Sequence, residues 1–235
     1  MATFGDSMPS AEKTPDSDDA KRLARRERRR EQTREEILDA ARQVLLRKGF
    51  GATTLEAVAR EVGVTKPALY YYFPSKDALL FELMFESLER HARAVHDAVE
   101  ETGDGAQALR VLIRETVELF APRMDDFRLA YLYGQVASQG SLHFNAEQFA
   151  RIRPLNELWF GGAAERLAEE RPKRPGSKRV EPRMMAFLAY LSAIGLLTMK
   201  GMVESVDDPL IYSDDQMIEA FGKIFEAAAA AMASR

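Results

Sequence analysis

The stretch from Thr33 to Lys76 constrains the fold of this 235-residue chain more than any other. It carries the start and stop signals of a long helix, two short helices joined at Gly63, and the beginning of a fourth helix. Gly63 can supply the left-handed backbone that a tight turn between two helices requires. Residues 65–73 read TKPALYYYF, so a short helix there exposes lysine, proline and tyrosines.

Two capping boxes predict where the first two helices begin. In this motif a hydroxyl accepts a hydrogen bond from a backbone N–H, and a Glu three residues later reaches back to the start of the helix. Thr33 with Glu36 and Thr53 with Glu56 fit that spacing. Gly49 stands where a left-handed residue would end the first helix.

The third helix is predicted to begin at Thr65, with Pro67 in its first turn, where a missing N–H costs nothing. Leu69 and Phe73 are expected to face the small core of this domain. Ser75 is expected to cap the helix that follows. The pattern therefore leaves the other side of the third helix exposed.

Charge is distributed unevenly along the chain, whose net charge is −4. Residues 21–76 carry 14 Lys or Arg against seven acids, whereas residues 1–20 carry one Lys against five acids. A basic end beside an acidic remainder is expected of a protein that meets phosphate at that end. Within it, KRLARRERRREQ (residues 21–32) has two interpretations: a solvated extension of the first helix, or an arm that adds phosphate or minor-groove contacts.

A short helix enters the major groove of DNA when its exposed face carries donors and small residues. Lys66 can donate to guanine, and Pro67 and Ala68 can contact a thymine methyl. Tyrosine hydroxyls suit phosphate oxygens. The alternative is a protein-interaction helix whose tyrosines only cover a small core; the charge and turn pattern favour DNA.

Residues 33–80 resemble the DNA-binding domain of the TetR (tetracycline-repressor) family of bacterial transcription regulators. The resemblance rests on the T-T-x-x-x-V-A cadence from Thr53, on Gly63-Val64-Thr65, and on L-Y-x-Y-F-x-x-K from Leu69 to Lys76. That family more often has His where Tyr72 stands. The resemblance covers about a fifth of the chain and implies an all-helical homodimer, but it does not identify the ligand.

By this resemblance, Lys66, Pro67 and Ala68 occupy base-reading positions. The positions that contact the DNA backbone are Thr54, Tyr70, Tyr72 and Lys76. The complete set of predicted DNA-binding residues is Thr53, Thr54, Thr65, Lys66, Pro67, Ala68, Tyr70, Tyr71, Tyr72 and Lys76.

The remaining sequence predicts further helices near 76–100, 106–121, 125–139, 146–170 with a kink at Pro154, 181–204 and 214–233. The predicted fold class is all-α: an N-terminal three-helix helix-turn-helix DNA-binding domain followed by a helical ligand-binding and dimerisation domain, with about nine helices in total. The predicted boundaries are a disordered tail over 1–20, the basic extension over 21–32, the helix-turn-helix domain over 33–76, and the helical effector-binding and dimerisation domain over 77–235.

A reader of two-fold symmetric DNA needs two recognition helices at a fixed separation, which requires a dimer. The last two predicted helices are the candidates, with intrasubunit core as the alternative. Gly195 and Gly201 would permit close helix approach. Residues 184–199 are uncharged and shorter than the roughly 20 residues that cross a bilayer, so we expect a helix buried on several sides in a cytoplasmic protein. The predicted interface residues are Met184, Leu188, Leu191, Gly195, Met217, Phe221, Ile224 and Phe225.

The middle helices carry many large, adaptable side chains. Each one alone is typical of ordinary core, but as a set they suit an internal pocket for a lipophilic molecule. The predicted pocket residues are Phe85, Phe120, Met124, Phe127, Tyr131, Gln135, Trp159, Phe187 and Tyr190.

These patterns favour a dimeric, ligand-responsive transcriptional repressor that binds a palindromic operator and is released by a small lipophilic effector. The alternative is an effector-independent, architectural DNA-binding protein that acts through protein partners. The absence of cysteine excludes disulfides and zinc–thiolate sites, and we predict no metal, cofactor or membrane partner. No nucleophile with a base, acid pair or phosphate loop supports an enzyme, so no catalytic residue is predicted.

Overall fold

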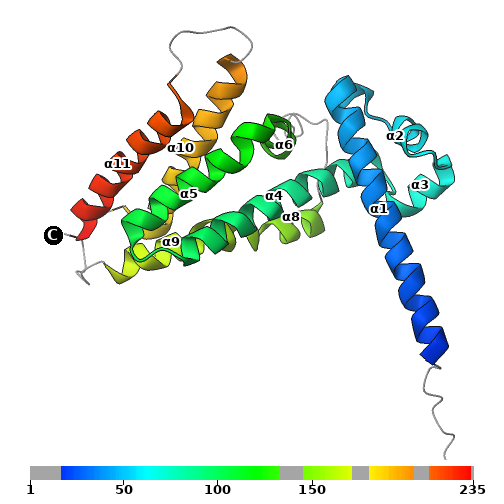
Figure 1. Cartoon of the computed structure of the whole chain (residues 1–235), viewed down its shortest axis with the longest axis horizontal. Coiled ribbons are helices and arrows are strands. Elements are labelled where there is room, and N and C mark those ends of the chain that lie inside the picture. The colour runs from blue at the N-terminus through cyan, green and yellow to red at the C-terminus, as the bar shows by residue number, and fades with distance from the viewer. Residues whose placement is uncertain (1–16, 133–144, 171–179, 204–211, 234–235) are drawn as a thin grey trace, which may run out of the picture.

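The computed structural model describes residues 17–132, 145–170, 180–203 and 212–233. These residues form helices throughout, and no strand occurs among them (Figure 1). The elements are α1 (Ser17–Ala52), α2 (Leu55–Val62), α3 (Lys66–Tyr72), α4 (Lys76–Glu100), α5 (Gly105–Phe120), the 3₁₀ turn η1 (Ala121–Arg123), α6 (Met124–Phe127), the π-helical turn η2 (Arg128–Leu132), α8 (Ala146–Ile152), α9 (Leu155–Glu169), α10 (Pro182–Val203) and α11 (Asp214–Ala233). The predicted all-α fold class is confirmed.

The first helix is longer than predicted, because α1 begins at Ser17 and runs without a break through the basic segment. The capping box predicted at Thr33 is wrong: Thr33 lies inside the helix, and its hydroxyl donates to the carbonyl of Arg29. A threonine hydroxyl caps only at a helix end, so the continuous arginine-rich helix removes that role. Residues 17–20 are helical rather than disordered, and residues 1–16 lie outside the described chain. The helical geometry is interrupted at Gly49 (φ 74°), the predicted end of this helix.

The turn and caps around α3 are confirmed. Gly63 adopts the left-handed conformation (φ 79°) and ends α2. The Thr65 hydroxyl accepts from the backbone N–H of Ala68, and Pro67 lies in the first turn of α3. The Ser75 hydroxyl accepts from the N–H of Ala78 at the start of α4. These local signals fix the orientation of α3 within the DNA-binding domain.

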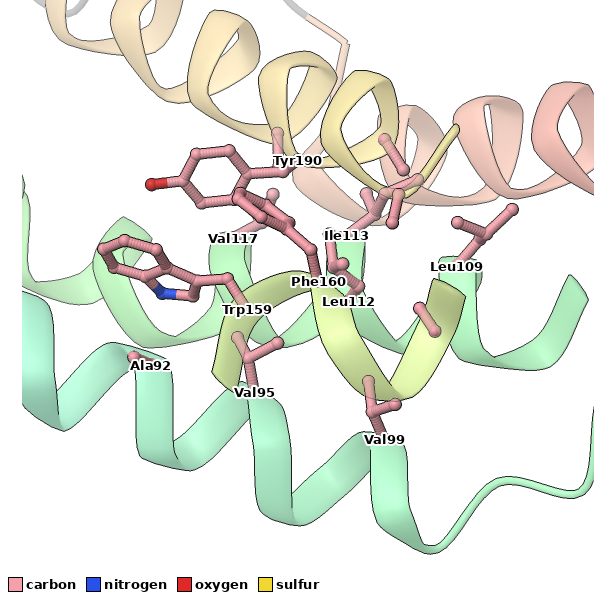
Figure 2. Close-up of a cluster of buried hydrophobic side chains, with 14 of the residues drawn as sticks. Ala92, Val95, Val99, Leu109, Leu112, Ile113, Val117, Trp159, Phe160 and Tyr190 are labelled. Atoms are coloured by element: carbon pink, nitrogen blue, oxygen red, sulfur yellow. The ribbon is translucent and has the colours of Figure 1, made fainter. Parts of the chain in front are cut away.

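Two hydrophobic cores share α4. Leu79, Leu80 and Leu83 belong to the core of the DNA-binding domain, together with side chains of α1, α2 and α3. The helix then continues into the larger core, where Val95 and Val99 meet α5 and α9. Figure 2 shows this larger core with α5, α9 and α10 around it. Because one helix contributes to both cores, α4 joins the DNA-binding domain to the rest of the molecule.

The helical domain is built around α5, which lies against α4, α9, α10 and α11. The chain breaks at Pro154 between α8 and α9, as the sequence predicts. The helix predicted over 125–139 begins instead as a short α-turn and a π-helical turn, and residues 133–139 lie outside the described ranges. The backbone N–H of Ser213 donates to the Gln216 side chain and the N–H of Gln216 donates to the Ser213 hydroxyl, which forms the predicted capping box of α11.

Candidate functional site

One side of α3 faces solvent, and the side chains on it are those of the predicted DNA-reading set. Thr65, Lys66 and Pro67 are exposed, as are 42% of Tyr70 and 68% of Tyr71. We call these five residues the α3 face. Leu69 is fully buried and Phe73 nearly so, and both pack in the core beneath the helix. The inward residues therefore fix the helix while its outward residues remain available to a partner.

The second threonine, not the first, caps α2. The hydroxyl of Thr54 accepts from the N–H of Ala57, and Thr54 is exposed. Thr53 is fully buried, and its hydroxyl donates to the carbonyl of Gly49. Both the capping box and the DNA contact predicted for Thr53 are therefore wrong, because its donor is already used inside the domain.

Ala68 and Tyr72 lie at the edge of the α3 face and are half-buried. Tyr72 packs against the core of the domain, and Tyr71 meets its ring edge-on at a centroid distance of 5.3 Å. The guanidinium of Arg30, on α1, lies 5.5 Å from the centroid of the Tyr71 ring. The basic part of α1 thus touches the same surface.

Lys66 is held by an ion pair across the turn. Its ammonium group binds the carboxylate of Glu56 on α2 and lies 5.7 Å from the Tyr70 ring centroid. The hydrogen bond with Lys66 lowers the pKa of Glu56, and the same bond raises the pKa of Lys66. Lys66 therefore stays charged and is presented beside Tyr70.

Lys76 lies in the first turn of α4 and is half-buried. Its burial lowers the pKa of the ammonium group, against a smaller opposing effect of Asp77. A partly desolvated cation interacts more strongly with an approaching phosphate than one fully in water. The position suits the backbone contact that the sequence predicts.

A second surface, on α10 and α11, is apolar and exposed. Met184 is 54% exposed, Leu188 and Leu191 lie one and two turns further along α10, and Ile224 on α11 is 61% exposed. At Gly195 an added Cβ would meet nothing within 4 Å, so the backbone of α10 is open there. Met217 and Phe221 are half-buried beside this stripe.

Three expectations about α10 and α11 are corrected. Phe225 is buried in the subunit core instead of facing outward. An added Cβ at Gly201, expected to allow close helix approach to a partner, would lie 3.0 Å from Met124 of the same subunit. By length and composition alone α10 could cross a membrane, and only 28% of its apolar window is buried. The core helix of a soluble protein passes the same test, but α10 is not buried on several sides within one chain.

A buried polar network, which the sequence did not indicate, lies in the core of the helical domain. His91 of α4 is fully buried, and its Nδ1 accepts from the indole N–H of Trp159 at 3.1 Å. Because an indole only donates, the His91 proton resides on Nε2, which then donates to the Thr116 hydroxyl at 3.1 Å. The Thr116 hydroxyl in turn donates to the carbonyl of Leu112.

Two tyrosines complete this network. The Tyr131 hydroxyl lies 3.2 Å from His91 Nδ1 and 2.5 Å from the Tyr190 hydroxyl. Burial lowers the pKa of His91 to about 3 and raises the pKa of both tyrosines. The His91 network, defined as His91, Thr116, Tyr131, Trp159 and Tyr190, is therefore uncharged at neutral pH.

Four other predicted pocket residues lie around this network or near it. The Phe120 ring centroid lies 4.8 Å from that of His91 and 5.7 Å from that of Phe127, which it meets edge-on, and Met124 is buried in the same core. Figure 2 shows Trp159 and Tyr190 side by side at one end of the apolar cluster, with ring centroids 5.7 Å apart. Phe85 is only half-buried and packs against this core from beside Phe81, at a centroid distance of 5.8 Å.

One predicted pocket residue lies elsewhere, and another falls outside the described ranges. Phe187 is 44% exposed and meets Phe160 edge-on at the surface, so its place in an internal pocket is wrong. The sequence pattern of α10 does not distinguish an aromatic ring that faces the core from one that faces outward. Gln135 lies outside the described residues.

Side-chain contacts of η2 and α8 add to the connection that α4 makes between the helical domain and the DNA-binding domain. Leu129 and Tyr131 are two residues apart in η2, yet Leu129 packs in the DNA-binding core and Tyr131 joins the His91 network. Glu82 of α4 binds Arg34 of α1 at 2.6 Å and also binds Arg151 of α8. A displacement of η2 or α8 would therefore reach α1 directly. Among the described residues, no cluster of His, Cys, Asp or Glu could hold a metal ion.

Known regulatory proteins share sequence similarity with this chain. Residues 37–83 match the family model "Bacterial regulatory proteins, tetR family". The chain is 28% identical over 102 residues to the HTH-type transcriptional activator FasR of Mycolicibacterium smegmatis, covering 43% of this chain and 47% of FasR. It is 24% identical over 172 residues to the HTH-type transcriptional regulator EthR of the same species, covering 73% and 74% respectively. The match to FasR thus spans about half the length of that relative.

A solved structure shows the same fold. The transcriptional regulator FadR from Bacillus subtilis, in complex with stearoyl-CoA, superposes with a TM-score of 0.58 at 16% identity. The superposition covers 83% of this chain and 97% of that one. The agreement therefore extends from the DNA-binding domain through the helical domain.

Proposed function

Because the chain belongs to the TetR family of bacterial regulatory proteins, we propose that it is a dimeric transcriptional regulator. It binds a palindromic operator through the α3 face and releases it when a small lipophilic effector enters the helical domain. Repression is the favoured direction, because release by a ligand frees the DNA for transcription. The protein acts in the cytoplasm, where its DNA is.

The α3 face is the single observation that carries this proposal. Lys66 and Pro67 stand outward at the start of α3, with Tyr70 and Tyr71 on the following turn, while Leu69 is fully buried beneath them. A lysine at the start of such a helix reaches base edges, and hydroxyls along its side reach phosphates. The helix is short and held at both ends by caps, so it enters a groove as a rigid unit.

Selection of duplexes from a random pool by the purified full-length chain tests the proposal. The expected result is enrichment of a two-fold symmetric sequence whose half-sites lie about 34–36 Å apart or somewhat more. Recovery of DNA without any enriched sequence would contradict sequence-specific regulation.

The dimer is proposed to form through the exposed apolar stripe of α10 and α11. Met184, Leu188 and Leu191 follow one another on one side of α10, and Ile224 stands on α11, which is packed beside α10. Covering them with a second copy removes apolar surface from water, and the open backbone at Gly195 lets the helices approach closely.

The oligomeric state of Leu188→Glu/Leu191→Glu tests this interface. Two charges in an apolar contact carry a desolvation cost of several kcal/mol each, so the variant is expected to be monomeric. Leu46→Glu, at a similarly exposed leucine of α1, is the control and should remain dimeric. Sedimentation of both variants gives the answer, and a dimeric double variant would place the interface elsewhere.

The effector is proposed to be a molecule with an apolar chain that separates the aromatic rings around the His91 network. That network has no charged member, since burial keeps His91 neutral. A carboxylate or phosphate there would find no compensating cation among the network's five residues. An apolar chain fits this environment, and a charged head group would stay outside; FadR of Bacillus subtilis, of the same fold, was solved with stearoyl-CoA.

Titration of the selected duplex complex with stearoyl-CoA and with free stearate tests the effector class. Release is expected, with a coupling free energy of about 1–3 kcal/mol. Tyr131→Phe removes one hydroxyl of the network and is expected to change the ligand concentration needed for release, with little change in DNA affinity without ligand. Unchanged operator binding with every ligand would favour the alternative, an effector-independent DNA-binding protein.

The proposed coupling runs through η2 and α4. A ligand that displaces Tyr131 from His91 also shifts Leu129, because both lie on the same helical turn. Leu129 packs against α4 residues in the DNA-binding core, so α4 and the α3 face follow. Only a ligand with different affinities for the two arrangements shifts the equilibrium.

A further inference from the structure

The N-terminal half of α1 is a basic helix that extends beyond the DNA-binding domain. Seven of the twelve residues 21–32 are Lys or Arg, and two are Glu. Figure 1 shows α1 continuing past α2 and α3 as a rod that no other helix accompanies. We propose that this basic helix, Lys21–Arg30, lies along the phosphates of duplex DNA that flank the half-site bound by the α3 face. The inference rests on the proposed function.

Contacts at its C-terminal end fix the position of the basic helix relative to the DNA-binding domain. Arg30 lies over the ring of Tyr71 on the α3 face, at 5.5 Å from the ring centroid. One turn later, Arg34 binds Glu82 of α4 at 2.6 Å. The helix is therefore anchored to the domain at the edge of the surface that meets DNA, and its direction from that point is set by a continuous α-helix.

The composition of the basic helix does not suit an apolar partner. Every Lys and Arg from Lys21 to Arg30 is exposed, and Leu23, 58% exposed, is the sole large apolar side chain in that segment. Like charges four residues apart, as in Arg22 with Arg26 and Arg25 with Arg29, weaken a helix that stands alone in water. An anionic surface relieves that repulsion, and the surface adjoining the α3 face in the complex is DNA.

The length of the segment matches several phosphates. Lys21 to Arg30 spans about 14 Å of helix, and the same length of duplex carries about eight phosphates. Contacts of this kind carry no sequence information, so they add affinity and salt dependence without altering the preferred sequence.

A charge-removal variant of the full-length chain tests the inference. Arg22→Gln/Arg25→Gln/Arg26→Gln/Arg29→Gln keeps good helix formers and leaves Arg30 on Tyr71. The control, Arg93→Gln/Arg114→Gln/Arg128→Gln/Arg183→Gln, removes the same charge from the helical domain. The probe is a mixed-sequence duplex of about 40 base pairs, with binding followed by fluorescence anisotropy from about 50 to 200 mM KCl.

The wild-type chain and the control are expected to share one slope of log K against log salt. In the basic-helix variant the slope should be shallower by about 0.9 for each phosphate that the protein no longer neutralises, or by about 2–4 in total. A slope equal to that of the wild type would overturn the inference while leaving the α3 face intact. Failure of the wild-type chain to bind the duplex at all would overturn the proposed function as well.

Discussion

Tyrosines serve two regions of this molecule in opposite surroundings. On the α3 face, Tyr70 and Tyr71 direct their rings and hydroxyls outward, 42% and 68% exposed. In the helical domain, Tyr190 is buried and Tyr131 is half-buried, and their hydroxyls lie 2.5 Å apart beside His91. The first pair keeps its hydrogen-bonding capacity for a partner outside the chain, whereas the second uses it within the core.

Because of this difference, substitutions in the two regions should affect different properties, namely DNA binding and the stability of the fold. A substitution on the α3 face removes a group that water already solvates, so the fold should lose little. A substitution in the His91 network removes one partner of a buried hydrogen bond and leaves the other unsatisfied, at a cost of about 1–3 kcal/mol. Surface variants should therefore alter DNA binding, and buried variants should alter unfolding and the response to ligand.

The largest expected effect contrasts two adjacent residues of α3. Leu69 is fully buried and Tyr70 is 42% exposed. Leu69→Ala should lower the free energy of unfolding by about 2–5 kcal/mol, while Tyr70→Ala should change it by about 0.5 kcal/mol or less. Urea unfolding measures both. Equal destabilisation would mean that Tyr70 belongs to the core and would remove the contrast between the two regions.

Acid should destabilise the helical domain through His91. Its pKa is about 3 in the folded chain, because burial disfavours the charged ring, against 6.5 when unfolded. The unfolded state therefore binds a proton between these values and the folded state does not. The stability contributed by neutral His91 is complete above pH 6.5 and is lost as pH falls toward 3, by at most about 1.4 kcal/mol per pH unit.

His91→Gln isolates this contribution, because glutamine keeps a donor and an acceptor but does not titrate. The difference in unfolding free energy between the two proteins should therefore shrink by about 1.6 kcal/mol between pH 6.5 and pH 5. Parallel stability curves over that interval would show that His91 is protonated in the folded chain.

A smaller effect is expected when Tyr70 loses only its hydroxyl. A hydrogen bond to a charged acceptor contributes about 1.5–3 kcal/mol, so Tyr70→Phe should weaken DNA binding about tenfold or more on every sequence. Tyr212→Phe, at an exposed tyrosine before α11, is the matched control and should bind as the wild type does. Anisotropy titrations measure both affinities. An unchanged affinity of Tyr70→Phe would show that this hydroxyl does not contact a phosphate.

The smallest effect concerns the ion pair between Lys66 and Glu56. Glu56→Gln should strengthen DNA binding, because it frees Lys66 and removes a negative charge beside the DNA. Water screens an exposed ion pair and leaves it little net strength, so the gain should be about fivefold at most. The control Glu61→Gln disturbs the neighbouring pair with Arg47 instead. A weaker complex with Glu56→Gln would show that Glu56 positions Lys66 for DNA.

Local signals made the DNA-binding domain predictable from sequence. Gly63, Pro67 and Ser75 each act within a few residues, and each stands in the conformation or cap position that its chemistry favours. The errors there are also local: Thr54 rather than Thr53 caps α2, since neighbouring threonines offer the same hydroxyl. Thr33 fails as a cap because helix propensity upstream continues the helix.

The helical domain was harder to predict because its chemistry depends on distant residues. His91 meets Thr116, Tyr131 and Trp159, which are 25 to 68 positions away in sequence. No spacing rule connects them, so a single histidine in a helical pattern carried no signal. Phe187 and Phe225 were placed wrongly for the same reason: the apolar pattern of a helix does not reveal which side chains face the subunit core and which stay exposed.

The central claim is that the α3 face reads DNA sequence, and selection with Lys66→Ala tests it most directly. Lys66 is the donor best placed for a base edge, since it is exposed at the first turn of α3. Duplex selection by the variant should yield the wild-type site with preference relaxed at one base pair in each half-site, a loss of about 1–3 kcal/mol of discrimination. An identical preference at every position would contradict the account and leave Lys66 on the phosphate backbone.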